Sequence, residues 1–378
     1  MKQTYFFRTP GRTEISGNQV DHQNGCVLTG AVDLYAEAEV TLNDSTVIRV
    51  DSEGFPLVEI DINDLSVREE EKNTSAALVR GVAASFAQCG CELQGFDARV
   101  KSNVLPGSGL SSSASFEVLI GTIINELFYD SKLSLVEVAQ ICQWAENVYF
   151  GKPCGLLDQM GSSLGGMAFI DFVDPADPIV EPLDFDFASA GHGLCIINCG
   201  ADHAGMTSKY AAVPTELNAI SALFGKTVLR EVPEEKFVAA LPRLRTQVSD
   251  RAILRAIHFY QENKRVRQQV EALRRNDFDT FLRLVKESGQ SSWMYMQNVI
   301  PSGAVERQEM AFALALCDVL LQDRGAYRVH GGGFAGTVQA FVPLDMLDWF
   351  KLRVETVLGP GSCLILTIQN QGTGQIKQ

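Results

Sequence analysis

The feature that most constrains this chain is a glycine- and serine-rich segment, residues 103–118, that leads directly into an apolar helix. Gly107 and Gly109 permit tight or positive-φ turns, and the serines at 111–113 stand where a helix would begin. A glycine-rich turn that feeds a helix N-terminus collects unpaired backbone N–H groups, so the segment predicts a phosphate site. Helical spacing of the apolar residues that follow predicts one buried face, formed by Phe116, Leu119, Ile120, Ile123, Ile124 and Leu127.

This segment matches neither of the two common nucleotide-binding loops. It lacks the GK[ST] ending of a Walker A loop. Gly225-Lys226-Thr227 has that ending, but Ile220 stands where the first glycine should be. Ser112 replaces the third glycine of the dinucleotide fingerprint. A loop that merely caps a helix is therefore the alternative for this string taken alone.

Composition bounds the class of protein. A length of 378 residues with 46% hydrophobic content predicts two globular domains. The net charge of -14 disfavours nucleic acid and anionic membrane as partners. The sequence shows neither a signal segment nor an apolar run long enough for a bilayer. Nine scattered cysteines indicate reduced thiols in the cytoplasm rather than disulfides or a zinc site.

The chain falls into two differently patterned halves. Pro10-Gly11 predicts a turn, residues 51–73 a surface excursion, and Ser134 with Glu137 a capping box that starts a helix running to about Tyr149. A Pro- and Asp-rich stretch, residues 174–187, is a plausible domain boundary. The second half is expected to contain helices and then a strand–turn–strand unit around Gly331–Gly333; the helices are expected near 213–224, 234–243, 250–275, 277–289, 303–322 and 344–358.

Two charged residues outside the loop could carry chemistry. Asp158 lies in a glycine-bounded segment, where a carboxylate could accept a proton from a hydroxyl or merely cap a short helix. Arg12 could hold a phosphate or a carboxylate, or form a surface ion pair. Asp21 and Tyr210 are further polar candidates. A phosphate site, a base and a cation together favour phosphoryl transfer, which depends on positioning and charge neutralisation.

Four motifs in order resemble the galactokinase family of the GHMP small-molecule kinases, and the resemblance runs from about Pro10 to Ile368; they read PGRTEISGNQVDHQNG, GSGLSSSASFEV, CGLLDQMGSSLGG and VHGGGFAGT. The overall similarity is greatest to galactokinase-like proteins of anaerobic Gram-positive bacteria. The resemblance implies an α+β fold with a ribosomal-S5-domain-2-like N-terminal domain, residues 1–185. It also implies a ferredoxin-like C-terminal domain, residues 186–378, with the active site in the cleft between the two.

The resemblance also implies ligands and residue roles. ATP and Mg²⁺ would bind together with a small sugar in a cytoplasmic monomer. Asp158 would act beside the sugar 1-hydroxyl, as general base or orienting anion, and Arg12 would lie between that hydroxyl and the γ-phosphate. Ser113 and Glu146 would bind the metal. The ATP phosphates would be bound by Gly107, Ser108, Gly109, Leu110, Ser111, Ser112 and Ser113, and the sugar by Asn18, Gln19, Asp21, Gly155 and Tyr210.

The chain departs from the family in its first motif. Galactokinases usually read GEHTDY where residues 17–22 read GNQVDH, so Asn18 and Gln19 replace an acid and a histidine associated with the hydroxymethyl end of the sugar. Losing a charged acceptor could weaken galactose binding by about 1–3 kcal/mol. Galactose is the expected substrate, with galacturonate or an N-acetylhexosamine as alternatives. A non-catalytic sugar and ATP sensor is a third possibility, but such relatives lack the Ser113-Ala114 pair found here.

Overall fold

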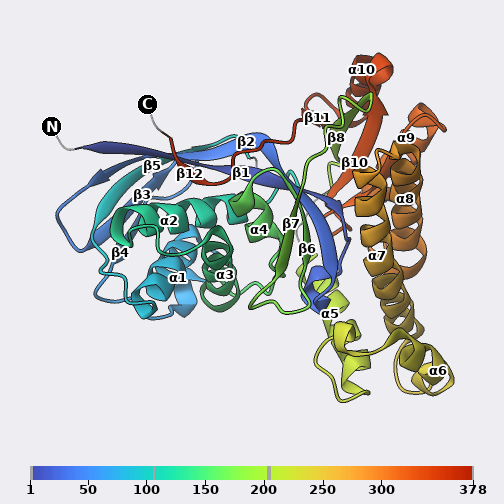
Figure 1. Ribbon diagram of the computed structural model, residues 1–378, viewed down its shortest axis with the longest axis horizontal. Coiled ribbons are helices and arrows are strands. Elements are labelled where there is room, and N and C mark those ends of the chain that lie inside the picture. The colour runs from blue at the N-terminus through green and yellow to red at the C-terminus, as the bar shows by residue number, and fades with distance from the viewer. Residues whose placement is uncertain (1–2, 105–106, 202–205, 377–378) are drawn as a thin grey trace.

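The computed structural model describes residues 3–104, 107–201 and 206–376, and it contains two β-sheets, each with helices packed on it (Figure 1). The first sheet has eight strands in the order β12-β1-β2-β5-β3-β4, with β6 and β7 extending from β2. Its strands are β1 (Thr4–Ser16), β2 (Cys26–Leu42), β3 (Val47–Ser52), β4 (Val58–Asp61), β5 (Phe96–Ser102), β6 (Met167–Asp171), β7 (Ile179–Leu183) and β12 (Gly374–Gln375).

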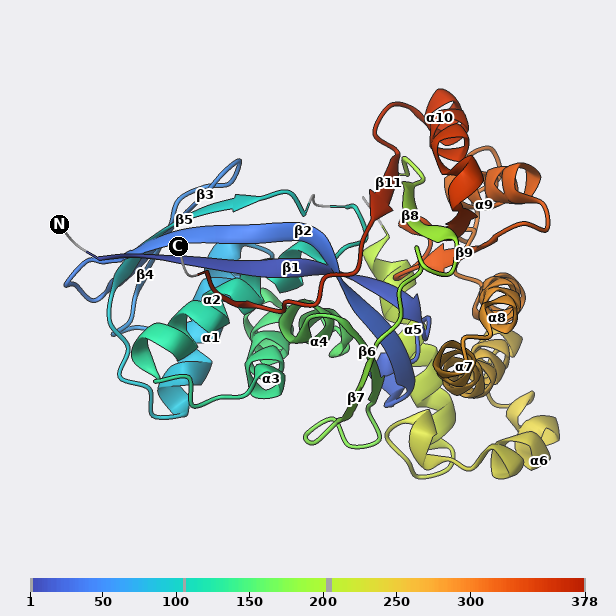
Figure 2. The ribbon, with the colours of Figure 1, turned by 45° about the horizontal axis from the view of Figure 1, so that its top comes forward.

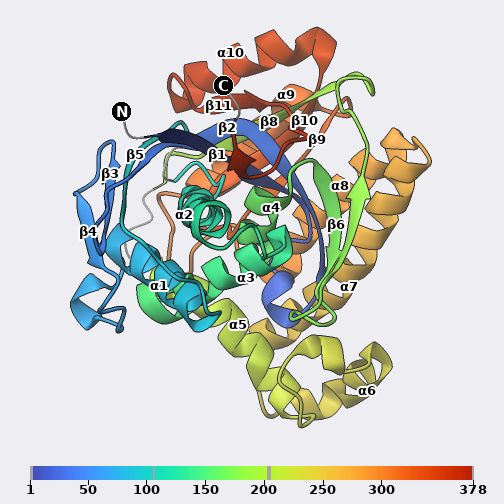
Figure 3. The same cartoon turned by 60° about the vertical axis from the view of Figure 1, so that its left-hand side comes forward.

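Four helices cover one face of this sheet (Figure 3): α1 (Ser75–Gln88), α2 (Ser112–Phe128), α3 (Leu135–Ala145) and α4 (Leu157–Leu164). The buried face predicted for α2 is confirmed, because Leu119, Ile120, Ile123 and Ile124 are fully buried and Phe116 and Leu127 pack against the same core. The capping box at Ser134 is also confirmed. The α-helix it starts ends at Ala145 and continues as one π-helical turn, Glu146–Phe150.

The second sheet has four antiparallel strands in the order β11-β8-β10-β9, namely β11 (Cys363–Leu366), β8 (His192–Asn198), β10 (Thr337–Pro343) and β9 (Ala326–His330). The predicted strand–turn–strand unit is thus confirmed as β9 and β10. The helices of this half are α5 (Thr207–Ala222), α6 (Glu234–Leu244), α7 (Asp250–Arg274), α8 (Phe278–Ser291), α9 (Glu309–Leu321) and α10 (Leu347–Leu358).

Two of these helices, α5 and α9, begin six residues from the expected start. Helix α5 starts before residue 213, with Pro214 inside it, a position that forfeits a backbone hydrogen bond and normally marks a helix start. Helix α9 starts six residues later than residue 303, because Gly303 takes a positive φ of 88° that ends any helical turn there.

The turn predicted at Pro10-Gly11 is wrong, because β1 runs unbroken through both residues. Its register against β2 shifts between Pro10 and Arg12, which is a β-bulge, and a bulge redirects the side chains that follow it. The backbone N–H of Arg12 donates to the Leu110 carbonyl oxygen at 3.1 Å. The bulge therefore places Arg12 against the phosphate loop.

The segment expected as a surface excursion, residues 51–73, contributes β4 to the edge of the first sheet, with Val58 and Ile60 buried. The chain passes to the second sheet between Leu183 and His192, and its end returns as β12 alongside β1 (Figure 2). The division into domains at residues 185 and 186 stays a prediction. No described helix is long and apolar enough to cross a bilayer.

Candidate active site

The described part of the phosphate loop leads into a helix N-terminus that no side chain caps. Ser111 takes a left-handed conformation, φ 58°, and α2 begins at the next residue without a side-chain cap. The first backbone N–H groups of a helix have no intrahelical partner and carry the positive end of its dipole. Residues 105–106 of the segment lie outside the described residues. The described loop therefore has the features that an anion site needs.

One glycine of the loop, Gly109, brings the loop against the second sheet. Gly109 has φ 74°, and a Cβ there would overlap the Thr337 hydroxyl of β10. Only glycine accepts both the conformation and this approach without strain. The loop thus lies between β1 of the first sheet and β10 of the second, where a bound phosphate would be near both halves of the chain.

Arg12 joins this loop to Asp158. Its Nε and Nη2 donate to Asp158 Oδ1 at 2.9 and 2.7 Å, and its Nη1 donates to the Gly109 carbonyl oxygen at 2.6 Å. Ser111 Oγ donates to the other carboxylate oxygen, Oδ2, at 2.6 Å. The structure therefore brings together the predicted base, the predicted cation and the predicted phosphate loop, which are far apart in the sequence.

Asp158 remains ionised in this setting. Burial raises the pKa of its carboxyl, but the charge of Arg12 and the hydrogen bonds from Ser111 and Arg12 outweigh burial, so the net pKa shift is downward. Asp158 lies in the first turn of α4 and does not cap it. The helix-cap interpretation of this residue is thereby excluded.

Ser113 and Glu146, the residues expected to bind the metal, also lie close together. Ser113 Oγ donates to Glu146 Oε1 at 3.5 Å, and the Glu146 side chain is almost fully buried. The other oxygen, Oε2, accepts hydrogen bonds from Gln159 Nε2 at 2.8 Å and from the Cys154 thiol at 3.2 Å. Among the described residues no group of three or more His, Cys, Asp or Glu side chains forms a metal cluster.

Glu117, a buried glutamate next to Glu146, was not predicted from the sequence as a site residue. Glu117 lies on the buried face of α2, and Gln159 Nε2 donates to its Oε1 at 2.8 Å as well as to Glu146. Burial and the adjacent Glu146 charge raise the pKa of Glu117 well above its ordinary value. The only signal in the sequence was an acid amid an apolar helix.

Asp21 and Gly155 are in direct contact. A Cβ on Gly155 would overlap the carboxylate of Asp21, so only glycine fits there. Burial and then the nearby Asp158 charge raise the pKa of Asp21 to about 6, although backbone N–H groups of His22 and Leu157 partly offset the rise. Asp21 and Asp158 are therefore two neighbouring carboxylates with different affinities for a proton.

The other residues expected at the sugar differ in accessibility. Gln19 is partly exposed, has φ 59°, and donates from Nε2 to the Gly332 carbonyl oxygen at 3.0 Å. The Tyr210 hydroxyl donates to the Gly333 carbonyl oxygen at 3.0 Å. Asn18, by contrast, has no exposed surface. Contacts between these residues and a sugar remain predictions.

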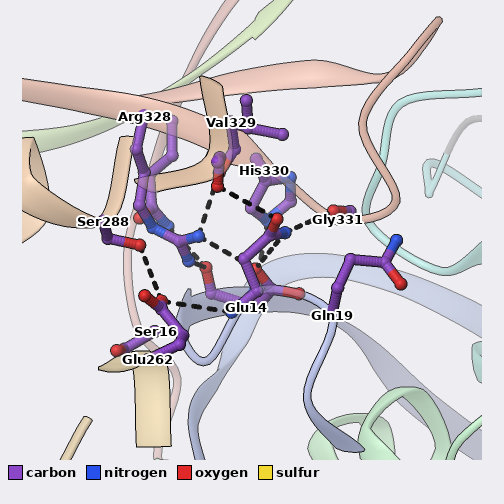
Figure 4. Close-up of polar contacts among 12 residues, drawn as sticks. Glu14, Ser16, Gln19, Glu262, Ser288, Arg328, Val329, His330 and Gly331 are labelled. Carbon is purple, nitrogen blue, oxygen red and sulfur yellow. Dashed lines mark hydrogen bonds and ion pairs between the residues drawn. The ribbon is translucent and has the colours of Figure 1, made fainter. Parts of the chain in front are cut away.

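Asn18 is held in a polar network that joins the two halves of the protein. Figure 4 shows Glu14, Arg328 and His330 of this network. Its Nδ2 donates to the Gly331 carbonyl oxygen at 2.6 Å and to Glu14 Oε1 at 3.1 Å, and Arg328 Nη1 donates to the same Glu14 oxygen at 3.0 Å. The Glu14 backbone N–H donates to His330 Nε2 at 3.1 Å, so that nitrogen must be an acceptor and the ring neutral. The network fixes β1 against β9.

The fold and this arrangement of loop, cation and carboxylate define a GHMP-type small-molecule kinase. A family model described as the GHMP kinases N terminal domain matches residues 77–166, and one described as the galactokinase galactose-binding signature matches residues 1–41. A galactokinase of Actinobacillus pleuropneumoniae is 33% identical over 351 residues, covering 92% of this chain and 87% of that protein. A galactokinase of Streptomyces coelicolor is 32% identical and covers 92% of this chain and 86% of that protein.

The chain therefore belongs to the galactokinase family. Among solved structures, Lactococcus lactis galactokinase in complex with galactose matches with a TM-score of 0.83 and 23% identity, covering 99% of this chain and 95% of that one. A mevalonate kinase matches with a TM-score of 0.67 and 13% identity, covering 97% of this chain and 99% of that one. At these identities the two structures confirm the two-domain GHMP-kinase fold alone.

Proposed function

We propose that this protein is an ATP-dependent galactokinase that transfers the γ-phosphate of ATP to the 1-hydroxyl of D-galactose, giving α-D-galactose 1-phosphate and ADP. The observation that carries the proposal is the joint contact of Asp158 with Arg12 and with Ser111 of the phosphate loop. This contact supports placing a hydroxyl acceptor and a γ-phosphate side by side. Family membership supports ATP and a sugar as the two substrates.

The arrangement suits direct transfer. The sugar O1 would attack the γ-phosphorus, its proton would pass to an Asp158 oxygen, and the bond from the γ-phosphorus to the β,γ-bridging oxygen would break to release ADP. Because the pKa of Asp158 is lowered, its carboxylate is anionic before transfer and orients the O1–H bond until the new P–O bond forms. Arg12, which hydrogen-bonds Asp158, would offset the charge on the transferring group.

Ser113 and Glu146 fit a magnesium ion, since a hydroxyl and a carboxylate are the oxygen ligands that Mg²⁺ prefers. When bound there, the ion would neutralise charge on the ATP phosphates. Cytoplasmic location is part of the proposal and is supported by all nine cysteines being free thiols. A monomeric state is also proposed, and the molar mass in solution tests it.

A substrate panel tests the assignment. ATP turnover is measured with galactose, glucose, galacturonate and N-acetylhexosamines, and galactose is expected to give the highest kcat/KM. A galacturonate preference of about tenfold or more, equivalent to about 1.4 kcal/mol, would overturn the galactose assignment. Tight sugar binding without any turnover would instead indicate a sensor.

We expect galactose turnover to fall at acid pH. Asp21 has a pKa of about 6, so its carboxylate is present above that pH and is protonated below it. A protonated carboxyl loses acceptor capacity toward sugar hydroxyls, and kcat/KM reports the ionisation of the free enzyme. Measured between about pH 5 and 8, kcat/KM for galactose should decline as the pH falls through 6. A flat profile, with folding verified by circular dichroism, would contradict the role of Asp21.

Gly155→Ala should impair sugar binding selectively. The added Cβ would displace the Asp21 carboxylate, and a misplacement of about 1 Å in a binding site can reduce kcat/KM about 10²-fold. The KM for galactose should rise while the affinity for ATP is kept. Gly374→Ala is the matched control, because a Cβ there approaches Glu126 no closer than 3.8 Å. Equal effects on both substrates would indicate general misfolding instead.

A further inference from the structure

Lys152 places an ammonium group at the active site. It follows Gly151, which has φ 83°, and its backbone N–H donates to the Glu146 carbonyl oxygen at 3.2 Å. Its Nζ donates to Glu146 Oε1 at 3.1 Å. The Lys152 side chain is 58% exposed, whereas that of Glu146 is 2% exposed. The solvent-exposed ammonium of Lys152 thus contacts the buried carboxylate of Glu146.

This ammonium lies beside the phosphate loop. The Glu146 oxygen that it contacts, Oε1, is the one that Ser113 Oγ approaches. Gln159 and Cys154 occupy the opposite oxygen, Oε2. The Lys152 charge also contributes to lowering the pKa of Asp158, after the larger contribution of Arg12. Lys152 therefore lies close to the phosphate loop and also influences the charge state of Asp158, the proposed base.

Lys152 is charged and has donors to spare. Its ammonium contacts the Glu146 carboxylate at 3.1 Å. The Cys154 thiol donates to the opposite Glu146 oxygen and so does not occupy the ammonium. An ammonium has three donors, and among the described residues Glu146 is its only hydrogen-bond partner. Two donors are left for a ligand.

The charge balance makes that spare capacity significant. The guanidinium of Arg12 is committed to Asp158 and Gly109. Asp158 and, above pH 6, Asp21 are anionic, and Glu146 is a third carboxyl group at the site. Lys152 offsets part of the negative charge that these carboxylates present to a polyanionic nucleotide. Phosphoryl transfer spreads charge over three equatorial oxygens, and the Lys152 ammonium would face them in addition to Arg12.

We propose that Lys152 is a phosphate-binding residue of this enzyme, and that its ammonium contacts the γ-phosphoryl group of ATP during transfer. The proposal rests on the proposed kinase activity. Glu146 holds the ammonium close to the loop in the absence of nucleotide, and the γ-phosphate then offers it a second anion. The identity of residue 152 therefore contributes directly to the rate of transfer.

The test is Lys152→Met, which keeps a long unbranched side chain without charge. Removing one donor aimed at transition-state charge costs about 10²–10³-fold in kcat, and kcat should fall to that extent with little change in the KM for galactose. Calorimetry should show about tenfold weaker binding of Mg²⁺·AMP-PNP, with Mg²⁺·ADP unaffected. Lys152→Arg, which retains a cation, should recover part of the loss.

Lys72→Met is the matched control, because this nearby lysine pairs with Glu69 and its aliphatic chain lies next to Gly151. It should behave like the wild type. Unchanged or faster turnover in Lys152→Met, or equal weakening of AMP-PNP and ADP, would overturn the proposal. If the wild type fails to phosphorylate galactose, the proposed function fails, but the AMP-PNP and ADP comparison still tests Lys152.

Discussion

Replacing Asp158 by asparagine should nearly abolish phosphoryl transfer while ATP still binds. Asparagine keeps the volume of the side chain, its Oδ1 can accept from Arg12, and its Nδ2 can donate to the Ser111 hydroxyl. It cannot take the proton of the sugar 1-hydroxyl. General acid–base catalysis contributes about 10²–10⁴-fold, so we expect a fall in kcat of that size.

Steady-state turnover with galactose measures this loss, and calorimetry with Mg²⁺·AMP-PNP measures nucleotide binding. Because the substitution removes the Asp158 charge, it should also lower the pKa of Asp21, which that charge helps to raise. Nuclear magnetic resonance of the Asp21 carboxyl would detect the shift. Turnover within about tenfold of the wild type would remove Asp158 from the reaction.

The sequence was sufficient to predict the parts of the site that depend on local chain geometry. Gly107 and Gly109 before a serine run predicted a loop at a helix N-terminus, and α2 begins at Ser112. Asp158 and Arg12 were recognisable as a carboxylate and a cation of the right type. Their 2.7 Å contact was not recognisable, because it joins residues 146 positions apart. Only the ordered motifs of a family connected them.

Other features depended on tertiary packing and lay beyond local rules. Pro10-Gly11 is a turn signal in isolation, but pairing with β2 keeps the strand intact and converts the signal into a bulge. Asn18 looked like a sugar ligand because of its motif, whereas its amide lies in the buried network with Glu14. The sequence did not single out Lys152, because the role proposed for it depends on its contact with the buried Glu146.

The two departures from the family motif, Asn18 and Gln19, therefore have different consequences for substrate choice. Asn18 satisfies its hydrogen bonds within the protein, and exchanging it for an acid would place a second carboxylate beside Glu14, whose pKa burial already raises. Gln19 is the more accessible of the two and contacts the Gly332 carbonyl oxygen. Within this motif, selectivity at the sugar is accordingly expected to depend more on Gln19 than on Asn18.

Arg12→Met should be the most damaging single change at the site. The guanidinium makes two hydrogen bonds to Asp158 and one to Gly109, and its charge offsets the burial of Asp158. An arginine that stabilises the charge of a transferring phosphoryl group is worth about 10³–10⁵-fold in kcat. We expect a loss in that range. Arg12→Lys should recover little of it, because an ammonium cannot reproduce the planar fork.

The double variant Arg12→Met/Asp158→Asn decides whether the two residues act as one unit. If Arg12 works partly by keeping Asp158 ionised and oriented, then removing Asp158 as well adds little further loss, and kcat of the double variant should match that of the poorer single variant. Melting temperatures provide an independent measure: Arg12→Met leaves an uncompensated carboxylate, and adding Asp158→Asn should restore stability. Fully additive losses in kcat, without recovery of the melting temperature, would show that Arg12 acts on the phosphate independently of Asp158.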